Sequence, residues 1–240
     1  DALLAASVPA QHRGLAFGLH RAMDNAGAVI GPLLAAGLLA AGASLQDVFL
    51  WSLLPAVVCL LMALAIREPP AAAVTAGAPS RDWTWRTLPP VFRRYLLVVA
   101  LFTLGNASNM FLLLRAAELG SPQTLVPMLW ATVAFTAMLF ATPLSALSDR
   151  VGRVRLLLGG YLAYALFYFV LGSMDAVSVM ALFAFFAGYG LSLAATEGVE
   201  KALVADLVPE ERRGTAFGWF NLVAGLFLLP ASLLFGIFYE

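Results

Sequence analysis

The stretch ALLAASVPAQHRGLAFG at residues 2–18 returns near the other end of the chain as ALVADLVPEERRGTAFG at residues 202–218. At a shift of 200 positions, ten of the seventeen aligned residues are identical, which chance does not supply. Each copy has the pattern of one helix end, a turn with the motif Pro-x-x-x-Arg-Gly, and the start of a second helix. The chain therefore contains parts of two related halves.

The composition indicates a membrane protein. The 240 residues are 62% hydrophobic and 12% charged, with a mean hydropathy of +0.89. A soluble domain of this size needs far more surface charge, so we expect an all-α, polytopic membrane protein. The fourteen basic and fourteen acidic residues cancel, which argues against nucleic acid as a partner. The single cysteine, Cys59, excludes a disulfide framework and a cysteine metal cluster, and the first residues predict no signal peptide.

Seven segments are long enough to cross a bilayer, which needs about 20 helical residues. Six of them contain no charge, whereas the segment nearest the start holds His20, Arg21 and Asp24 in its first half. The predicted spans are residues 14–40, 48–66, 95–114, 125–147, 156–174, 176–196 and 215–239.

The basic residues orient these spans, because Lys and Arg are retained in short loops on the cytoplasmic side. Eleven of the fourteen basic residues fall in alternate loops, and none falls in the opposite loops. The arginine-bearing loops are therefore expected in the cytoplasm. One of them is a Pro-rich linker at 67–94, in which Trp83 and Trp85 suggest a short segment on the membrane surface.

The spacing of the repeat predicts how the chain is divided. If the linker joins equal halves and each repeated turn follows a fourth span, each half has six spans. Residues 1–66 are then the end of the N-terminal bundle, 67–94 the central linker and 95–240 the C-terminal bundle. Seven of twelve expected spans are visible, and spans 1 to 3, nearly all of span 4, and span 12 are expected outside this sequence.

Two motifs resemble signatures of the major facilitator superfamily (MFS). The segment LSDRVGRVR at 147–155 is similar to the family's loop signature G-x-L-x-D-R-x-G-R-R between spans 8 and 9. The segment GAVIGPLLAA at 27–36 is similar to the span 5 signature G-x-x-x-G-P-x-x-G-G of antiporters. Residues 1–24 resemble a group of largely uncharacterised bacterial and archaeal permeases. The resemblance implies an MFS-type fold, a multi-pass location in the cell membrane, and secondary transport.

The loop signature implies a gate. By analogy with the family, Asp149 caps the start of span 5 near Gly14, where free N–H groups stabilise an anion, and Arg153 reaches Asp206. Such bonds would tie the halves together on the cytoplasmic face and break when that side opens. The alternative is that the arginines only fix the topology. The implied gate motif comprises Asp149, Arg150, Gly152, Arg153, Arg155 and Asp206.

Two pairs of small residues on span 5 predict close helix packing. Gly14 and Gly18 form one pair, and Gly27 and Gly31 form the other, with Pro32 beside it. Small residues four apart let backbones approach where lipid supplies no hydrophobic driving force.

Asp24 on span 5 is a candidate proton site. It follows Gly14 by ten residues, which places it roughly 15 Å deep in the membrane, on the same face as the second glycine pair. A charge at that depth must be paired or protonated. Asp24 is therefore either clamped by Arg21 or a proton-binding group, whereas His20 is expected to be structural.

Span 10 offers a second group of ionisable residues. Tyr189, Thr196, Glu197 and Glu200 lie on one helical arc, and Lys201 is four residues from Glu197. The family resemblance implies that this arc faces the cavity, with Tyr189 and Thr196 among the substrate contacts. One Lys can compensate one Glu, so a surplus acid is left that could bind and release protons. The alternative is a solvated position near the cytoplasm.

The family resemblance implies that spans 1, 4, 7 and 10 line the cavity. On span 7, Thr103, Asn106 and Asn109 are predicted to share a face, and so to contact substrate. Hydrogen bonds between helices are the alternative role for the two Asn side chains. Arg115 and Glu118, one turn apart, are expected to pair near the outer boundary.

Together these features predict a secondary transporter that moves a small solute by alternating access, with proton antiport, and hence export, as the first choice. Proton symport or uniport in the same fold is the nearer alternative, and a non-transporting receptor or scaffold is the alternative from another class. No catalytic or metal-binding motif stands in the sequence, so neither an enzyme nor a metal site is expected. The proton gradient is the expected energy source, with no cofactor. The expected partners are a small-molecule substrate and the lipid bilayer, and the full-length protein is expected to be a monomer.

Overall fold

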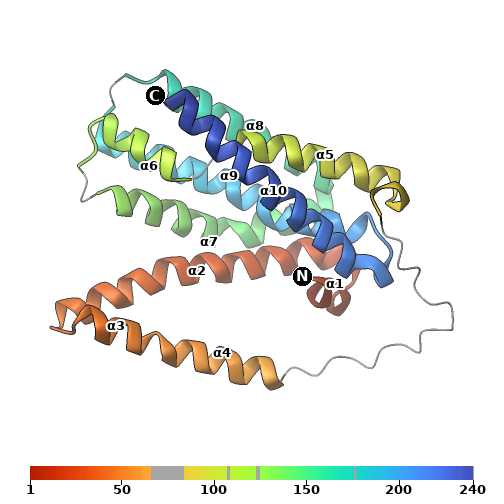
Figure 1. The fold of residues 1–240 in the computed structure, drawn as a ribbon, viewed down its shortest axis with the longest axis horizontal. Helices are drawn as coiled ribbons and strands as arrows, with labels where there is room; N and C mark the ends of the chain where they lie inside the picture. The colour runs from red at the N-terminus through yellow and green to blue at the C-terminus, as the bar shows by residue number, and fades with distance from the viewer. Residues whose placement is uncertain (66–83, 107–108, 123–124, 176, 240) are drawn as a thin grey trace.

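The computed structural model describes residues 1–65, 84–106, 109–122, 125–175 and 177–239. Every regular element within these ranges is helical (Figure 1). The helices are α1 (Ala2–Ser7), α2 (Arg13–Ala40), α3 (Leu45–Trp51), α4 (Leu53–Ala65), α5 (Pro90–Gly105), α6 (Asn109–Glu118), α7 (Val126–Val151), α8 (Arg153–Ser173), α9 (Val179–Asp206) and α10 (Arg213–Tyr239), with short 3-10 turns at Ala10–His12, Trp85–Thr87 and Glu210–Arg212.

Seven helical segments of the described chain are long and apolar enough to cross a membrane, as the sequence predicted. Several run further than expected. α9 continues from Val179 to Asp206, well beyond the predicted end at Thr196. The prediction ended each span at the first charge, whereas a helix continues through charged residues that pair or reach the membrane boundary.

The predicted span at 95–114 is not one continuous helix. α5 ends at Gly105, the backbone of Asn106 leaves the helical region at φ −105° and ψ 78°, and α6 begins at Asn109. Thr103, Asn106 and Asn109 therefore do not share one regular helical face, which corrects the prediction. Gly and Asn are weak helix formers, and the apolar pattern that identified the span carries no signal for this break.

The predicted linker lies outside the described residues up to position 83, which includes Trp83. Its described part begins at 84 and docks against α10. The rings of Trp85 and Trp219 are 6.2 Å apart, and Leu88 is buried. This part of the linker is thus held by the bundle.

α7 and α9 form the centre of the bundle. α7 packs against α2 and α9, and α9 also contacts α8 and α10 (Figure 1). Small residues allow this closeness: a Cβ on Gly14 would lie 2.2 Å from the Ser145 carbonyl oxygen, and one on Gly18 would lie 2.7 Å from that of Ala141. The first glycine pair therefore packs as predicted.

The second glycine pair behaves differently. A Cβ on Gly27 or Gly31 would meet nothing within 4 Å in the described part of the chain, and Pro32 is exposed beside them. Asp24, predicted on the same packing face, has a side chain that is 50% exposed. The predicted close approach on this stretch of α2 is therefore not made within the described residues, because α7 covers a different face of the helix.

The two copies of the repeat lie face to face at one end of the bundle. The Phe17 and Phe217 rings are 5.9 Å apart. Arg13 donates to the carbonyl of Ala205 at 3.4 Å, and Arg213 donates to that of Ala5, also at 3.4 Å. Exchanging the two copies converts the Arg13–Ala205 contact into the Arg213–Ala5 contact, so an approximate two-fold axis passes between the copies. We call this end of the bundle, where α2, α8 and α10 begin with an arginine, the basic end.

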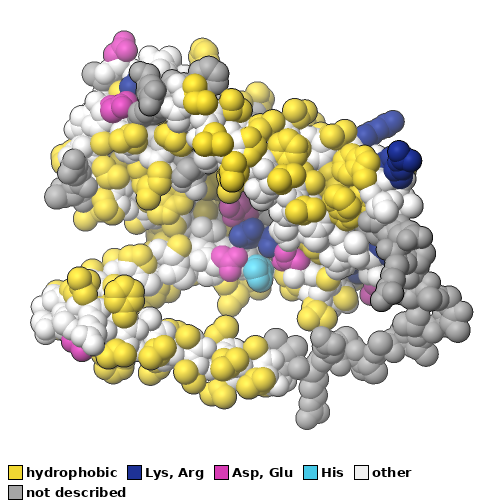
Figure 2. Space-filling model, viewed as in Figure 1, with side chains coloured by type: hydrophobic (Ala, Val, Ile, Leu, Met, Phe, Trp, Pro, Cys, Tyr) yellow, Lys and Arg dark blue, Asp and Glu magenta, His cyan; other side chains and the backbone are white. Residues whose placement is uncertain are grey.

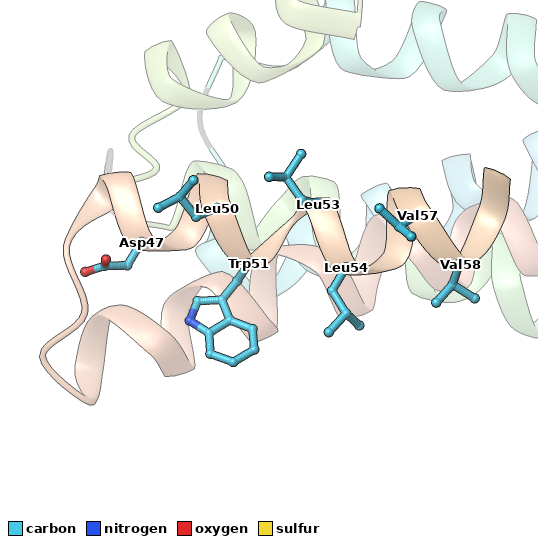
Figure 3. Close-up of a pocket in the computed structure, with 7 residues that line it drawn as sticks. All are labelled: Asp47, Leu50, Trp51, Leu53, Leu54, Val57 and Val58. Carbon is cyan, nitrogen blue, oxygen red and sulfur yellow. The ribbon is translucent and has the colours of Figure 1, made fainter. Parts of the chain in front are cut away.

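α3 and α4 return along the outside of α2 and leave a long apolar surface. Figure 3 shows the hollow over these two helices, which is lined by Asp47 and six apolar side chains from α3 and α4 themselves. Pro55, which cannot donate a backbone hydrogen bond, accompanies the break between the helices near Ser52. Such an exposed apolar surface is what a membrane-embedded helix presents to its surroundings.

Two glycines on α9 provide a matched test of this packing. A Cβ on Gly190 would lie 2.6 Å from the Val133 carbonyl oxygen, whereas one on Gly188 would meet nothing within 4 Å in the described chain. Gly190→Ala should therefore lower the unfolding temperature of the detergent-solubilised full-length protein, with an overpacking cost of about 1–3 kcal/mol. Gly188→Ala should leave the unfolding temperature unchanged or raise it. Equal behaviour of the two variants would contradict the α7–α9 packing.

Candidate functional site: an ionic lock and a charged cavity

An ionic lock joins four helices at the basic end. Asp149, in the last turn of α7, accepts hydrogen bonds from the backbone N–H groups of Gly14 at 2.9 Å and Leu15 at 3.0 Å. The carboxylate thus caps the start of α2, where unpaired N–H groups favour an anion. α7 ends directly after it because Gly152 adopts φ +99°, a conformation that favours glycine.

Asp206, at the end of α9, receives two arginines. Arg13 of α2 donates to it at 2.6 Å, and Arg153 of α8 donates to its other oxygen. Arg153 also lies 2.8 Å from Asp149, so two carboxylates and two arginines form one network that links α2, α7, α8 and α9. The Asp149, Gly14, Arg153 and Asp206 contacts expected from the loop signature are present, while the gating role stays a prediction.

Two arginines of the predicted gate motif lie outside this network. Arg150 is exposed, and Arg155 reaches only the Val151 carbonyl at 3.5 Å. Arg13, in contrast, was missed as a lock residue, although its side chain is only 10% exposed. The identical arginine at the equivalent position 213 was the available signal.

The lock is not symmetric. Ala6 stands at the position equivalent to Asp206, so Arg213 has no counterpart of the Arg13–Asp206 pair. Arg213 instead donates to backbone carbonyls and lies 3.6 Å from the exposed Glu210. One carboxylate, Asp206, therefore holds the arginines of both α2 and α8.

A cavity of about 400 Å³ lies beside the lock, between α2, α5, α9 and α10. Figure 2 shows acidic, basic and histidine side chains gathered in the hollow at the centre of one face. Polar and charged residues of the four helices line it together with apolar side chains that include Phe102 and Phe220. The polar and charged lining residues are Arg21, Thr103, Asn106, Thr196, Glu197, Glu200, Lys201 and Asn221.

Tyr189, which was predicted to face the cavity, is fully buried elsewhere. Its ring packs 4.5 Å from that of Phe167, and its hydroxyl donates to Asn109 at 3.0 Å. Asn106 accepts from Tyr164 at 3.1 Å. Both Asn side chains therefore make hydrogen bonds between helices, the alternative role considered for them, and Asn106 also lines the cavity.

Arg21 lies between two acids. Its guanidinium is 3.4 Å from Asp24 and 3.8 Å from Glu197, so it links carboxylates on α2 and α9. His20 lies 3.5 Å from the same Asp24 oxygen. The local Arg21–Asp24 clamp considered from the sequence is present, and it extends across to the neighbouring helix.

Lys201 does not pair with Glu197, which corrects the prediction. Its ammonium group instead lies 2.8 Å from Asp1. Spacing along one helix could not show this, because the partner comes from the other copy of the repeat. Positions 1 and 201 are equivalent under the 200-residue shift, and equivalent residues meet at the axis, as Phe17 and Phe217 do.

Glu200 differs from the other acids of the cavity. Its carboxylate accepts a hydrogen bond from the Tyr161 hydroxyl at 2.7 Å. Within the described residues it has no ion-pair partner, whereas Asp1, Asp24 and Glu197 each have one. Tyr161 was not identified from the sequence, because it is one of three tyrosines in an apolar span and nothing in the pattern distinguishes it from Tyr164 and Tyr168.

Near the opposite end of the bundle, Arg115 and Glu118 form the predicted pair at 3.2 Å. Arg115 also donates to the Met174 carbonyl at 2.6 Å and so ties α6 to the end of α8. The pair lies apart from the charged cavity.

Fold and site define the class of this protein: a multi-pass helical membrane protein in which two copies of a helix–turn–helix unit meet beside a polar cavity. Parallel repeats of this kind are the framework of many secondary transporters. The chain belongs to the Major Facilitator Superfamily, whose family model matches residues 1–226. This confirms the family predicted from the two motifs.

Several proteins that are named as uncharacterised are similar to this chain. The chain is 33% identical, over 252 aligned positions, to an uncharacterised MFS-type transporter from Methanocaldococcus jannaschii, an alignment that covers 100% of this chain and 61% of the relative. It is 29% identical to uncharacterised proteins from Mycobacterium bovis and Mycobacterium tuberculosis, with 60% of each covered. The chain thus spans about three-fifths of the length of the curated relatives it matches. No solved structure matches it significantly.

The lock can be tested with Asp206→Asn in the full-length protein. Losing charge-assisted bonds worth about 1.5 kcal/mol should shift the equilibrium roughly tenfold toward an open basic end. The measurement is the labelling rate of Thr196→Cys, a buried cavity position, in a Cys59→Ser background, with an impermeant thiol reagent added on the side that the basic end faces.

Glu210→Gln is the matched control, because Glu210 is exposed and lies 3.6 Å from Arg213. It should leave the labelling rate unchanged. Equal labelling rates in Asp206→Asn, Glu210→Gln and the parent protein would show that the network is not a lock.

Proposed function

We propose that the full-length protein moves a small solute across the membrane by alternating access, coupled to protons that bind Glu200. One observation carries this proposal. Arg21 forms ion pairs with Asp24 and Glu197, and Lys201 forms one with Asp1. Glu200 lines the cavity, but no cation lies within ion-pair distance of its carboxylate in the described chain. An uncompensated carboxylate in a membrane cavity is costly, so such a group can alternate between a protonated and a charged form.

The arrangement of the repeat supports alternating access. α2 and α10 meet at the basic end, where Phe17 contacts Phe217, and they separate toward the opposite end (Figure 1). The ionic lock closes the basic end of the cavity in this arrangement. In the proposal the basic end faces the cytoplasm, and breaking the Asp206 contacts opens the cavity to that side.

Export by proton antiport is the form we favour, because the segment at 27–36 resembles the antiporter signature of span 5. Symport or uniport would use the same cavity and is the nearer alternative. A receptor or scaffold without transport has less support, because neither role calls for an uncompensated acid beside a cavity. The proposal requires the proton gradient and the bilayer, but no cofactor and no catalysis, and the full-length protein acts as a monomer.

The experiment uses the full-length protein in proteoliposomes with an imposed pH gradient and a panel of small neutral, anionic and cationic solutes. Glu200→Gln should abolish uphill movement of any solute that the parent protein transports, while solute exchange persists. Exchange persists because the cavity remains, whereas the proton site is lost. Uphill and exchange rates are measured in parallel.

Glu118→Gln serves as the control, because this acid pairs with Arg115 away from the charged cavity. It should retain both uphill movement and exchange. Uphill transport that survives in Glu200→Gln would place the proton site elsewhere, and a parent protein that binds solutes without moving them would favour the receptor alternative.

A further inference from the structure

We propose that Tyr161 is the positioning residue of Glu200: its hydroxyl takes the place of a counter-ion and sets the pH at which Glu200 exchanges its proton. This inference rests on the proposed function and adds a residue from α8, a helix to which the sequence assigned no part in the cavity. The contact that carries it is the 2.7 Å hydrogen bond from the Tyr161 hydroxyl to a Glu200 carboxylate oxygen.

The Tyr161 ring is held in one orientation. It stacks on Phe102 of α5 with the ring centroids 3.9 Å apart and the planes inclined by 19°. Phe102 in turn lies 5.0 Å from the Tyr164 ring, one turn further along α8. A phenol fixed between α5 and α9 directs its hydroxyl without the entropy cost of ordering a long, flexible side chain.

The glycine before Tyr161 allows the contact. A Cβ on Gly160 would lie 2.5 Å from a Thr196 methyl carbon, so α8 approaches α9 there more closely than a larger residue permits. This close approach brings the next residue within reach of Glu200, one turn after Thr196 on α9. The same chain segment therefore supplies both the approach and the donor.

The other polar and charged groups around Glu200 have contacts of their own, so we assign this role to Tyr161. The hydroxyl of Tyr95, from α5, contacts the Glu200 backbone carbonyl at 3.4 Å and not its carboxylate. Arg21 of α2 has Asp24 and Glu197 as partners, and Lys201 of α9 has Asp1. From α10 the cavity receives the neutral Asn221. The charged groups that face the site are thus Arg21, Asp24, Glu197 and Lys201, all of which have partners of their own.

A neutral donor has a different effect from a cation. A hydrogen bond to the charged form favours that form, but less than a full opposite charge does. In this inference the hydroxyl favours the charged form of Glu200 without holding the carboxylate in that form, as a cation would. A Lys or Arg in place of Tyr161 would hold the carboxylate charged and remove it from proton exchange.

The test is Tyr161→Phe in the full-length protein, which removes the hydroxyl and keeps the ring that stacks on Phe102. The carboxyl band of Glu200 is followed by infrared difference spectroscopy over a pH titration, and Glu200→Gln identifies the band. Without the hydroxyl, the charged form loses its donor, so the titration midpoint should move to higher pH by about one unit. The pH profile of uphill transport should move in the same direction.

Tyr168→Phe is the matched control. Tyr168 lies two turns along the same helix, among the rings of Tyr164 and Tyr189, and it does not line the charged cavity. This variant should leave the titration midpoint unchanged. The unfolding temperatures of both variants are compared with that of the parent to exclude a loss of folding.

The outcomes separate this inference from the proposed function. A shift in Tyr161→Phe alone supports the inference, even if Glu200→Gln retains uphill transport and the proposed coupling fails. An unchanged midpoint in Tyr161→Phe, an equal shift in Tyr168→Phe, or the absence of any titrating band assigned to Glu200 would overturn it.

Discussion

The close approach of three helices at Gly18, Ser145 and Gly198 is the constraint on which the rest of the structure depends. A Cβ on Gly18 would lie 2.5 Å from the Cβ of Ser145, and a Cβ on Gly198 would lie 2.5 Å from the hydroxyl oxygen of Ser145. Lipid gives apolar helices no hydrophobic reason to associate, so this contact relies on dispersion between backbones that only small residues let approach. One turn from it, toward the basic end, Asp149 reaches the start of α2. On the other side, Arg21 reaches Glu197. The helix contact at Gly18, Ser145 and Gly198 therefore positions the residues of both the lock and the cavity.

Charge is handled differently in these two places. In the lock, Asp206 and Asp149 take bonds from arginines and backbone N–H groups, which offsets the cost of removing the carboxylates from water. In the cavity, Glu200 has no ion-pair partner among the described residues, and its carboxylate accepts a hydrogen bond from the hydroxyl of Tyr161. A fully paired network resists change until it breaks as a unit, whereas an acid held by one neutral donor responds to pH. The division suits a lock that changes with conformation and a site that changes with protonation.

The sequence predicted the features that follow from repetition and periodicity. The family, the helical fold and the seven spans were predicted, and so was the contact of Asp149 with the start of α2. The break after Gly105 was not predicted, because an apolar run reads the same whether or not the helix is continuous. The Lys201–Asp1 pair was missed because spacing was considered within one helix and not across the repeat. Tyr161 gave no signal, since three tyrosines stand in that apolar span and only the fold shows which of them lies opposite an acid.

The repeat also explains why the cavity is asymmetric. Residues that meet on the axis can be identical if they are apolar, as Phe17 and Phe217 are, but two like charges there would repel each other. Charged residues that face each other directly across the axis must therefore differ between the copies, whereas Arg13 and Arg213 can be identical because each contacts a backbone carbonyl of the other copy. Asp1 opposes Lys201 across the axis, and Arg21 has Asn221 as its equivalent. The two cations of the cavity, Arg21 and Lys201, have the non-cationic equivalents Asn221 and Asp1, so a symmetric set of ion pairs is impossible. This divergence between the copies accompanies the absence of an ion-pair partner for Glu200 within the described residues.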